Sequence, residues 1–337
     1  MSEFVAPASF RALRVAVTDG AVQRGVTRVP WETLPDHDVT VRVSYSSVNY
    51  KDALSATGNR GVSRNYPHTP GIDAAGTVVE SRDARFAPGD EVLCTGHDLG
   101  MGTPGGLAEY VRTPAEWLVK LPSGLSARDA MALGTAGFTA ALAVERLGVA
   151  GVAPRLGPVV VTGASGGVGT MAVALLAGAG FEVVASTGKA EAAALLARLG
   201  AASTLRREEL AAPDKRPLLA AKYAGGVDTV GGDTLAGLLK YTTIGGAVAS
   251  CGMVGGAELT TSVFPFILRG VSLMGIDSQH ASSEMRDTLW GRLAADAHLR
   301  GLLADEELVR TVALDELELW IAKLLAGEVV GRVVVKL

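Results

Sequence analysis

The chain has 337 residues, 48% of them hydrophobic and 20% charged, with a formal net charge of −4. These values are typical of a globular protein with room for two domains, and they exclude a disordered chain. The negative net charge and the lack of a basic stripe argue against nucleic acid as a partner.

The cysteines and the apolar segments restrict the class of protein further. Cys94 and Cys251 are far apart, so they indicate neither a disulfide framework nor a metal cluster. No segment has the pattern of a signal peptide or of a membrane span. We therefore expect a cytoplasmic protein that does not bind a membrane.

The N-terminal part of the chain is predicted to be rich in β-structure. Phe10–Thr18 and Val39–Ser47 are β-branched runs with rough alternation of apolar positions, and Gly76–Glu80 continues in the same style. The first helical patterns cover Ser126–Ala132, where Ser126 is the expected N-cap, and Thr139–Leu147.

From Pro158 onward the pattern changes to alternating strands and helices. The candidate strands are short apolar runs, most of them separated by helical stretches: Val159–Val161, Phe181–Ser186, Ser203–Leu205, Val227–Val230, Ala247–Ser250 and Val271–Gly275. Six strands of this kind predict one doubly wound parallel sheet in an α/β fold.

A glycine-rich turn, Gly163–Gly169, lies between Val159–Val161 and the small-residue helix predicted at Met171–Ala179. A second apolar run, Phe181–Ala185, follows. Strand, glycine turn, helix and strand form the βαβ unit that binds dinucleotides, because glycine lets the backbone approach a pyrophosphate at the helix N-terminus. A chance glycine turn is the alternative, and the flanking strands and helix argue against it.

The C-terminal segment is predicted to contain a helix over about Ser283–Leu303, a second helix at Leu314–Leu325 and a strand at Arg332–Leu337. That strand resembles the N-terminal β-rich part. We therefore expect a discontinuous β-rich domain made of residues 1–130 and 281–337, with a dinucleotide-binding domain at 131–280.

Seven motifs narrow the family: Ser46-Ser47-Val48-Asn49-Tyr50-Lys51-Asp52, Pro70-Gly71-Ile72-Asp73, Gly105-Gly106-Leu107-Ala108-Glu109-Tyr110, Gly134-Thr135-Ala136-Gly137-Phe138-Thr139-Ala140, Thr162–Gly169, Asp228-Thr229-Val230-Gly231 and Pro265-Phe266-Ile267-Leu268-Arg269. With the domain order, they resemble the medium-chain dehydrogenase/reductase superfamily, in the quinone-oxidoreductase branch that contains acrylyl-CoA reductase. The resemblance implies a GroES-like catalytic domain and a Rossmann domain.

Zinc is not expected. Zinc-dependent members of the superfamily carry a Gly-His-Glu motif where this chain has Pro70-Gly71-Ile72-Asp73, and a structural zinc site needs about four nitrogen or sulfur ligands. His68 and His97 remain, and each is interpreted as an ordinary loop residue.

The predicted cofactor is NADPH. NAD-specific sites place Asp or Glu at the end of the second strand, where this chain has Thr187-Gly188-Lys189, a close variant of the Ser-Gly-Arg that the resembling family carries. Hydroxyl, N–H and ammonium groups bind a 2′-phosphate that a carboxylate would repel. Arg207 is a candidate to flank the same phosphate, or else a solvated charge.

The resemblance implies further cofactor contacts. Ser165, Gly166, Gly167 and Val168 would lie on the pyrophosphate and Thr229 beside the ribose. Met253 and Thr139 would lie near the nicotinamide. Ordinary packing at strand ends is the alternative for each of them.

The expected reaction is hydride transfer to an acceptor that is already activated, because no metal Lewis acid is predicted. The leading hypothesis is reduction of a short enoyl thioester such as acrylyl-CoA, with an enolate protonated at the α-carbon. The family motif places Asn49 and Tyr50 at the nicotinamide as candidate catalytic residues, and Tyr50 would bind the cofactor, support the oxyanion or donate a proton. Alternatively, Tyr50 only packs while Lys51 and Asp52 form a surface ion pair.

Other functions and partners remain open. An NADPH:quinone oxidoreductase and a non-catalytic NADPH-binding protein are the alternatives, and the substrate class covers enoyl thioesters, enones and quinones. Arg64 and Arg269 are candidates for the anionic parts of a CoA, or structural residues. The resemblance also implies a homodimer that pairs Val271–Gly275 with its copy, because an exposed strand edge needs covering.

Overall fold

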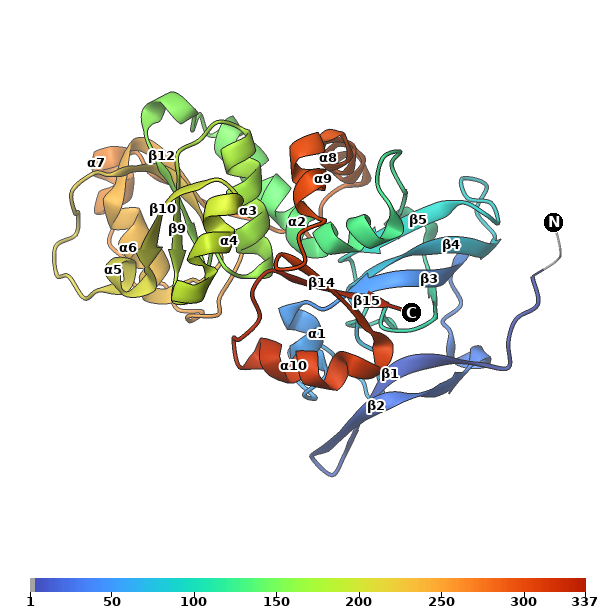
Figure 1. The fold of residues 1–337 in the computed structure, drawn as a ribbon. Coiled ribbons are helices and arrows are strands. Elements are labelled where there is room, and N and C mark those ends of the chain that lie inside the picture. Colours follow the sequence, from blue (N-terminus) through green and yellow to red (C-terminus); the bar gives the residue numbers. More distant parts are fainter. Residues whose placement is uncertain (1–3) are drawn as a thin grey trace. The chain divides into compact units, whose positions relative to one another are not determined.

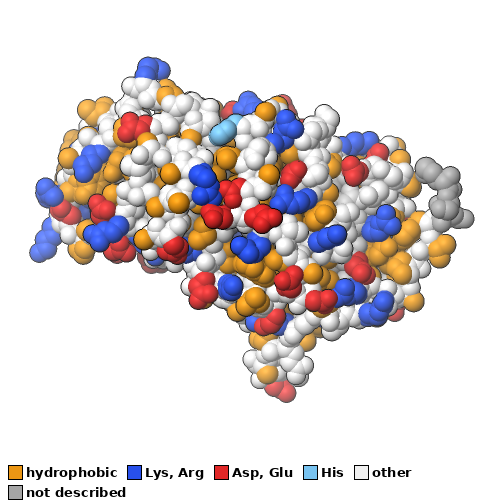
Figure 2. Space-filling model, viewed as in Figure 1, with side chains coloured by type: hydrophobic (Ala, Val, Ile, Leu, Met, Phe, Trp, Pro, Cys, Tyr) orange, Lys and Arg blue, Asp and Glu red, His pale blue; other side chains and the backbone are white. Residues whose placement is uncertain are grey.

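The computed structural model describes residues 4–337 and divides the chain into two compact units (Figure 1). The discontinuous unit comprises the chain up to Thr135 together with Gln279–Leu337, and the central unit is Ala136–Ser278. No helix among the described residues is both long and apolar enough to cross a membrane. On the face drawn in Figure 2, acidic and basic side chains are interspersed.

The central unit contains a six-stranded sheet in which every pair of neighbours is parallel. Its strands, in chain order, are β8 (Val159–Thr162), β9 (Val183–Thr187), β10 (Ala201–Arg206), β11 (Tyr223–Asp228), β12 (Thr242–Ser250) and β13 (Ser272–Gly275). The spatial order β10-β9-β8-β11-β12-β13 is the doubly wound order. The predicted parallel sheet is confirmed.

Helices cover both faces of this sheet. They are α3 (Gly167–Gly178), α4 (Ala193–Arg198), α5 (Arg207–Ala211), α6 (Gly232–Tyr241) and α7 (Phe264–Arg269). Figure 1 shows α3 and α4 on one face and α5, α6 and α7 on the other. Strands β8 and β11 are buried along their whole length, as expected for central strands of a parallel sheet covered on both sides.

The discontinuous unit contains a seven-stranded sheet and a separate hairpin. The sheet strands are β3 (Val39–Ser47), β4 (Asp73–Ser81), β5 (Glu91–Thr95), β6 (Tyr110–Thr113), β7 (Leu118–Lys120), β14 (Val309–Ala313) and β15 (Arg332–Lys336). The C-terminal β15 pairs antiparallel with β3, with Val334 opposite Ser47. The predicted return strand is therefore confirmed, and it brings Arg332 close to the segment that follows Ser47.

The hairpin of β1 (Ser9–Thr18) and β2 (Ala21–Pro30) was only half predicted, because β2 was missed. Its two-residue loop, Asp19-Gly20, has positive φ at both positions, which is the turn that joins twisted strands most readily. The Asp-Gly pair was the available sequence signal.

A buried core holds the short helix α1 (Tyr50–Ser55) in place. α1 packs with α10 (Leu317–Leu325), β1 and β15 through apolar side chains that include Leu13, Val48, Ala53, Ile321 and Val335. The segment that carries Asn49 and Tyr50 is thus anchored on one side by the return strand and on the other by α10.

One helix prediction needs correction. The helix predicted over Ser283–Leu303 is divided into α8 (Ser283–Ala295) and α9 (Ala297–Leu302), because Asp296 leaves the helical region and caps α9 by accepting from the Leu299 amide at 2.8 Å. The two helices predicted at Ser126–Ala132 and Thr139–Leu147 are both present within α2 (Ala127–Val149), which leaves the helical region between them at Gly134, where φ is 52° and ψ is −157°.

Candidate active site

The segment between β3 and α1 is fixed by a capping box. Asn49 is the extended N-cap of α1, and its backbone N–H donates to Asp52 Oδ2 at 2.8 Å. Asp52 Oδ1 in turn accepts the backbone N–H groups of Gly71 (3.1 Å) and Ile72 (2.9 Å). Asp52 is buried, and Lys51 donates to Gln279 at 3.0 Å, so the alternative of a surface Lys51–Asp52 ion pair is wrong.

Asp73 is the second buried carboxylate of this region. It accepts hydrogen bonds from Ser47 Oγ (2.6 Å), Asn49 Nδ2 (2.8 Å) and the Thr135 hydroxyl (2.6 Å), and the Thr135 backbone N–H lies 3.0 Å from both of its oxygens. A Cβ on Gly134 would stand 2.5 Å from Asp73 Oδ2, which explains why the break in α2 needs glycine.

Arg332 completes this buried polar cluster. Its side chain is only 3% exposed, and its guanidinium donates to Ala132 O (2.9 Å), Asn49 Oδ1 (3.1 Å) and Ser47 Oγ (2.8 Å). It lies 3.8 Å from Asp73 Oδ2. Sequence reasoning missed Arg332, and the available signal was a charged residue opening the apolar run Arg332-Val-Val-Val.

The electrostatics of the cluster follow from two carboxylates and one guanidinium in a buried place. Burial, together with the Asp73 carboxylate, raises the pKa of Asp52 to about 7. Burial also lowers the pKa of Arg332 from its ordinary value, and the two carboxylates oppose that shift. When Asp52 is protonated, the negative charge of Asp73 and the positive charge of Arg332 balance each other.

Asn49 and Tyr50, predicted together, have different surroundings. The amide of Asn49 is bound on both its oxygen and its nitrogen inside the discontinuous unit, by Arg332 and Asp73. Tyr50 is the first residue of α1, its side chain is 43% exposed, and its hydroxyl has no hydrogen-bond partner among the described residues. Of the pair, Tyr50 has the group available to a ligand.

The glycine turn of the central unit connects β8 to α3. Gly163 has φ of 59°, Gly166 is the N-cap, and a Cβ on Gly169 would overlap the Gly163 carbonyl oxygen. Gly167 and Val168 begin the helix, where the first N–H groups have no intrahelical acceptor and attract anions.

The predicted phosphate-binding residues lie together at the end of β9. The hydroxyls of Ser165 and Thr187 are 2.9 Å apart, and Thr187 Oγ1 accepts the Lys189 backbone N–H at 3.1 Å. A Cβ on Gly188 would stand 3.2 Å from a guanidinium nitrogen of Arg207, which places Arg207 directly over this turn. Arg207 is exposed and binds no other described residue.

Thr229 is brought to the glycine turn by a second buried carboxylate network. Its hydroxyl donates to Thr162 O at 2.8 Å. The neighbouring Asp228 accepts from the hydroxyls of Thr162 (2.7 Å) and Ser250 (3.0 Å) and from the Gly231 N–H (3.0 Å). Asp228 thereby joins the carboxyl ends of β8, β11 and β12, a role that sequence reasoning missed.

The two residues predicted near the nicotinamide differ in exposure. Met253, after β12, has a side chain that is 65% exposed. Thr139 is buried, and its hydroxyl donates to Ser278 Oγ at 2.8 Å. Its hydroxyl is therefore already engaged within the central unit.

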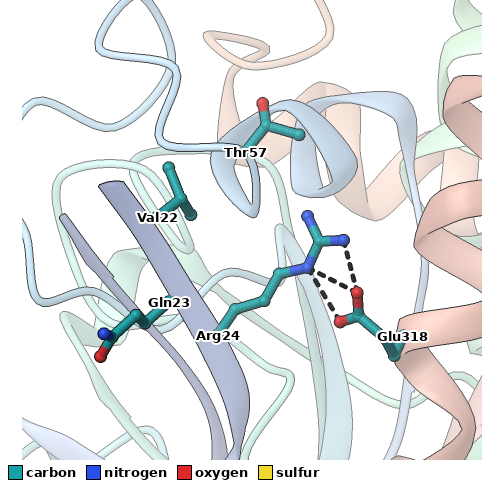
Figure 3. A pocket seen from close by; sticks show the side chains of 5 residues that line it. All are labelled: Val22, Gln23, Arg24, Thr57 and Glu318. Atoms are coloured by element: carbon teal, nitrogen blue, oxygen red, sulfur yellow. Dashed lines mark hydrogen bonds and ion pairs between the residues drawn. The ribbon is translucent and has the colours of Figure 1, made fainter. Parts of the chain in front are cut away.

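One pocket of about 520 Å³ lies in the discontinuous unit, lined by Val22, Gln23, Arg24, Thr57 and Glu318 (Figure 3). Arg24 points at the Glu318 carboxylate and donates two hydrogen bonds from Nε, at 2.8 and 3.0 Å. It also donates to Ala56 O at 3.1 Å, at the end of α1. Because its charges are already paired and no predicted site residue lines it, we do not assign this pocket to the active site.

Comparison with known proteins identifies the family. Residues 35–123 match the alcohol dehydrogenase GroES-like domain family, and residues 167–295 match the zinc-binding dehydrogenase family. The putative quinone oxidoreductase YhfP of Bacillus subtilis is 45% identical over 97% of this chain and 99% of its own length. The acrylyl-CoA reductase AcuI of Ruegeria pomeroyi is 47% identical over 94% and 95% of the two chains. The chain belongs to the medium-chain dehydrogenase/reductase superfamily.

Solved structures of relatives of this superfamily member share its fold. The Escherichia coli YhdH structure with bound NADPH is 46% identical, covers 96% of this chain and 99% of that one, and has a TM-score of 0.92. The Bacillus subtilis YhfP structure with bound NAD is 45% identical, covers 98% and 100%, and has a TM-score of 0.93. The predicted family and its oxidoreductase class are confirmed.

Zinc does not fit this member of the superfamily. Ile72 offers no ligand atom, and the Asp73 carboxylate is already bound by Ser47, Asn49 and Thr135. Across residues 4–337, no group of three or more His, Cys, Asp or Glu could hold a metal ion.

The basic residues considered for a CoA have different surroundings. Arg269 donates to the backbone oxygens of Lys240 (2.9 Å), Thr242 (3.0 Å) and Leu219 (2.5 Å), so it is a structural residue of the α7 region. Arg64 is exposed, and its guanidinium makes no hydrogen bond to a described residue. Only Arg64 has its charge available.

Proposed function

We propose that this protein is an NADPH-dependent reductase of activated C=C bonds, acting on a short enoyl thioester of the acrylyl-CoA type. The observation that carries the proposal is the group of Ser165, Thr187, Lys189 and Arg207 at the end of β9, next to the glycine turn. Relatives named acrylyl-CoA reductase, at 46–47% identity over nearly the whole chain, support the choice of acceptor.

The residues of the central unit fit NADPH. The glycine turn and the first N–H groups of α3 would hold the pyrophosphate. The hydroxyl of Thr187, the ammonium of Lys189 and the guanidinium of Arg207 would hold the 2′-phosphate, because no carboxylate stands at Thr187–Lys189 to repel it. Thr229 and Met253 would contact the ribose and the nicotinamide.

The chemistry requires an acceptor that stabilises negative charge by itself. When bound, NADPH supplies a hydride from C4 of its nicotinamide. The β-carbon of the enoyl thioester accepts the hydride, the π electrons move to the α-carbon and the thioester oxygen, and a proton is then added at the α-carbon. Tyr50 is proposed to act at the reacting atoms, because its hydroxyl is not engaged by other described residues.

The two compact units are proposed to be the two domains of the chain. The discontinuous unit is the GroES-like domain that carries Tyr50, and the central unit is the Rossmann domain that holds NADPH.

We place the protein in the cytoplasm, in line with two free cysteines and no disulfide among the described residues.

A homodimer through the edge of the central sheet is also proposed. β13 ends the sheet and, among the described strands, pairs only with β12. The adjoining α7 region exposes the large apolar side chains of Val263, Phe264, Ile267 and Leu268. Pairing with a second copy would cover both the strand edge and these side chains.

Parallel steady-state assays with acrylyl-CoA and 1,4-benzoquinone test the substrate. We expect NADPH oxidation with both acceptors and a higher kcat/KM for acrylyl-CoA. A higher kcat/KM for the quinone would favour the second candidate, quinone reductase, which the 45%-identical relative named putative quinone oxidoreductase supports. Binding of NADPH without turnover of any enone, thioester or quinone would indicate a non-catalytic protein.

A further inference from the structure

Arg332 contacts three separate parts of the discontinuous unit. It lies at the start of the last strand, β15, and its side chain is 3% exposed. Nε donates to Ala132 O in α2, and the two terminal nitrogens donate to Asn49 Oδ1 and Ser47 Oγ. The planar guanidinium can make these bonds simultaneously because its donors form a rigid fork.

The amide of Asn49 is oriented by one cation and one anion. Arg332 only donates, so it binds Oδ1, whereas the Asp73 carboxylate only accepts, so it binds Nδ2 at 2.8 Å. Nδ2 also lies 3.3 Å from Ser47 Oγ and from Asp52 Oδ2, so removing the guanidinium would leave only the Oδ1 end of the amide without its donor. Arg332 therefore supplies the charged donor that holds the Oδ1 end of Asn49.

Asn49 in turn determines where α1 begins. It is the N-cap of the helix, and the capping box with Asp52 fixes the first turn, whose first residue is Tyr50. The backbone of Tyr50 is thus fixed by the buried polar cluster of Asp73, Arg332 and Asn49. Its side chain is half exposed, and its hydroxyl is bound by no other described residue. Such a division suits a side chain that must act from a fixed position.

We propose that Arg332 is a positioning residue for Tyr50, acting through Asn49 and the N-terminus of α1. The inference rests on the proposed function, in which Tyr50 contacts the substrate or the cofactor. It assigns a role in the reaction to the C-terminal strand, and it explains why a buried arginine opens the run Arg332-Val-Val-Val.

A double-mutant cycle tests the proposal, using Tyr50→Phe, Arg332→Lys and the double variant. Lysine keeps the charge but loses the fork, so it cannot bind Ala132, Asn49 and Ser47 together. We expect Arg332→Lys to lower kcat by about tenfold or more, since a misplacement of about 1 Å can cost about 100-fold. We further expect the double variant to be within about threefold of the worse single variant, because both changes act on one group.

The pattern of the kinetic change separates positioning from a general loss of structure. We expect both Tyr50→Phe and Arg332→Lys to lower kcat, and Arg332→Lys to leave the Kd of NADPH within about threefold of the value for Tyr50→Phe. Arg112→Lys is the matched control, because Arg112 is a half-buried arginine of the same unit that donates to Thr40 Oγ1 and Pro35 O and has no contact with α1. We expect this control to keep wild-type kcat.

Each remaining outcome is decisive. If Arg332→Lys does not fold, Ser47→Ala replaces it, because the Ser47 hydroxyl joins Arg332 to Asp73. Losses in kcat that multiply, or an Arg332→Lys enzyme within about twofold of wild type, would overturn the positioning role while leaving the proposed reaction intact. Wild-type protein without thioester or quinone turnover would instead overturn the proposed function, and Tyr50→Phe with unchanged kinetics would overturn the role of Tyr50.

Discussion

We propose that Lys189 and Arg207 decide cofactor preference, because the Lys189 backbone N–H donates to the Thr187 hydroxyl and the Arg207 guanidinium lies over Gly188. We expect the double variant Lys189→Ala/Arg207→Ala to raise the Kd of NADPH by about 100-fold, since hydrogen bonds to charged groups contribute roughly 1.5–3 kcal/mol each. The Kd of NADH should change by less than about threefold. Titration of NADPH and NADH fluorescence measures both constants.

Arg206→Ala is the matched control for that experiment. Arg206 is the exposed neighbour of Arg207, and it lies 3.9 Å from Glu209 instead of over Gly188. Its removal should leave both dissociation constants near their wild-type values. An equal loss of NADPH and NADH affinity in the double variant would show that the two cations do not recognise the 2′-phosphate.

Asp52 gives the stability of the protein a particular pH dependence. Its pKa is raised from 3.8 to about 7 in the folded protein, so the folded state keeps a proton that the unfolded state releases above about pH 4. The contribution of this group to stability is full below pH 4, and it falls as the pH rises to 7. Asp52→Asn should make the free energy of unfolding decrease less steeply with pH, by up to about 1.4 kcal/mol per pH unit.

Urea unfolding at pH 5, 6 and 7 measures that difference between wild type and Asp52→Asn. Asp83→Asn is the control, because Asp83 has its pKa lowered to about 2 by Arg85 and is already ionised in both states above pH 5. The control should parallel wild type across the whole range. A free-energy difference between Asp52→Asn and wild type that is constant from pH 5 to 7 would contradict the raised pKa.

At the scale of elements, the break of α2 at Gly134 allows the helix to pass close to the buried Asp73 and Arg332. Gly134 has positive φ, and a Cβ there would crowd Asp73 Oδ2 and a terminal nitrogen of Arg332, at 2.5 and 2.7 Å. Gly134→Ala should therefore destabilise the protein by more than about 2 kcal/mol, through backbone strain and displacement of the cluster. Thermal and urea unfolding measure this loss.

For Gly148, in the same helix, we do not expect a substitution by alanine to destabilise the protein. A Cβ at this position would meet nothing within 4 Å, and the residue is helical. Gly148→Ala should leave stability unchanged or raise it by up to about 1 kcal/mol. Equal effects of the two substitutions would mean that Gly134 is not constrained by Asp73 and Arg332.

The elements were predictable from the sequence where the pattern was local. The β8–α3–β9 unit and the return strand follow from apolar periodicity and glycine spacing. The division at Asp296 was missed because a capping aspartate inside a helical pattern resembles any other exposed residue. Arg332 was missed because its partners, Ser47, Asn49 and Asp73, lie more than 250 residues away in the chain and are brought together only by the β15–β3 pairing.

The site divides in the same way. Ser165 and Thr187–Lys189 were predicted as separate phosphate contacts, and they lie together because two consecutive strands of a parallel sheet end side by side. The sequence did not predict that the Asn49 amide binds Arg332 and Asp73, because no spacing in the sequence indicates which of two neighbouring polar residues faces inward.

For the whole molecule, the exposed apolar residues beside β13 lead to a prediction about assembly. Ile267→Asp/Leu268→Asp should convert a dimer into a monomer at micromolar concentration, because both side chains are exposed and charges there would be buried by pairing. Light scattering coupled to gel filtration measures the mass. Leu319→Asp, at an exposed position of α10, is the control and should keep the wild-type mass. A monomeric wild-type protein would contradict the proposed homodimer.

The most direct test of the central claim follows the hydride into the product. Acrylyl-CoA is incubated with the protein and NADPH deuterated at C4, and the saturated thioester is examined by NMR and mass spectrometry. We predict one deuterium at the β-carbon from the cofactor, and one at the α-carbon when unlabelled NADPH is used in deuterium oxide. A product with no cofactor-derived deuterium at the β-carbon, or NADPH consumption by quinones with no thioester reduction, would contradict the account.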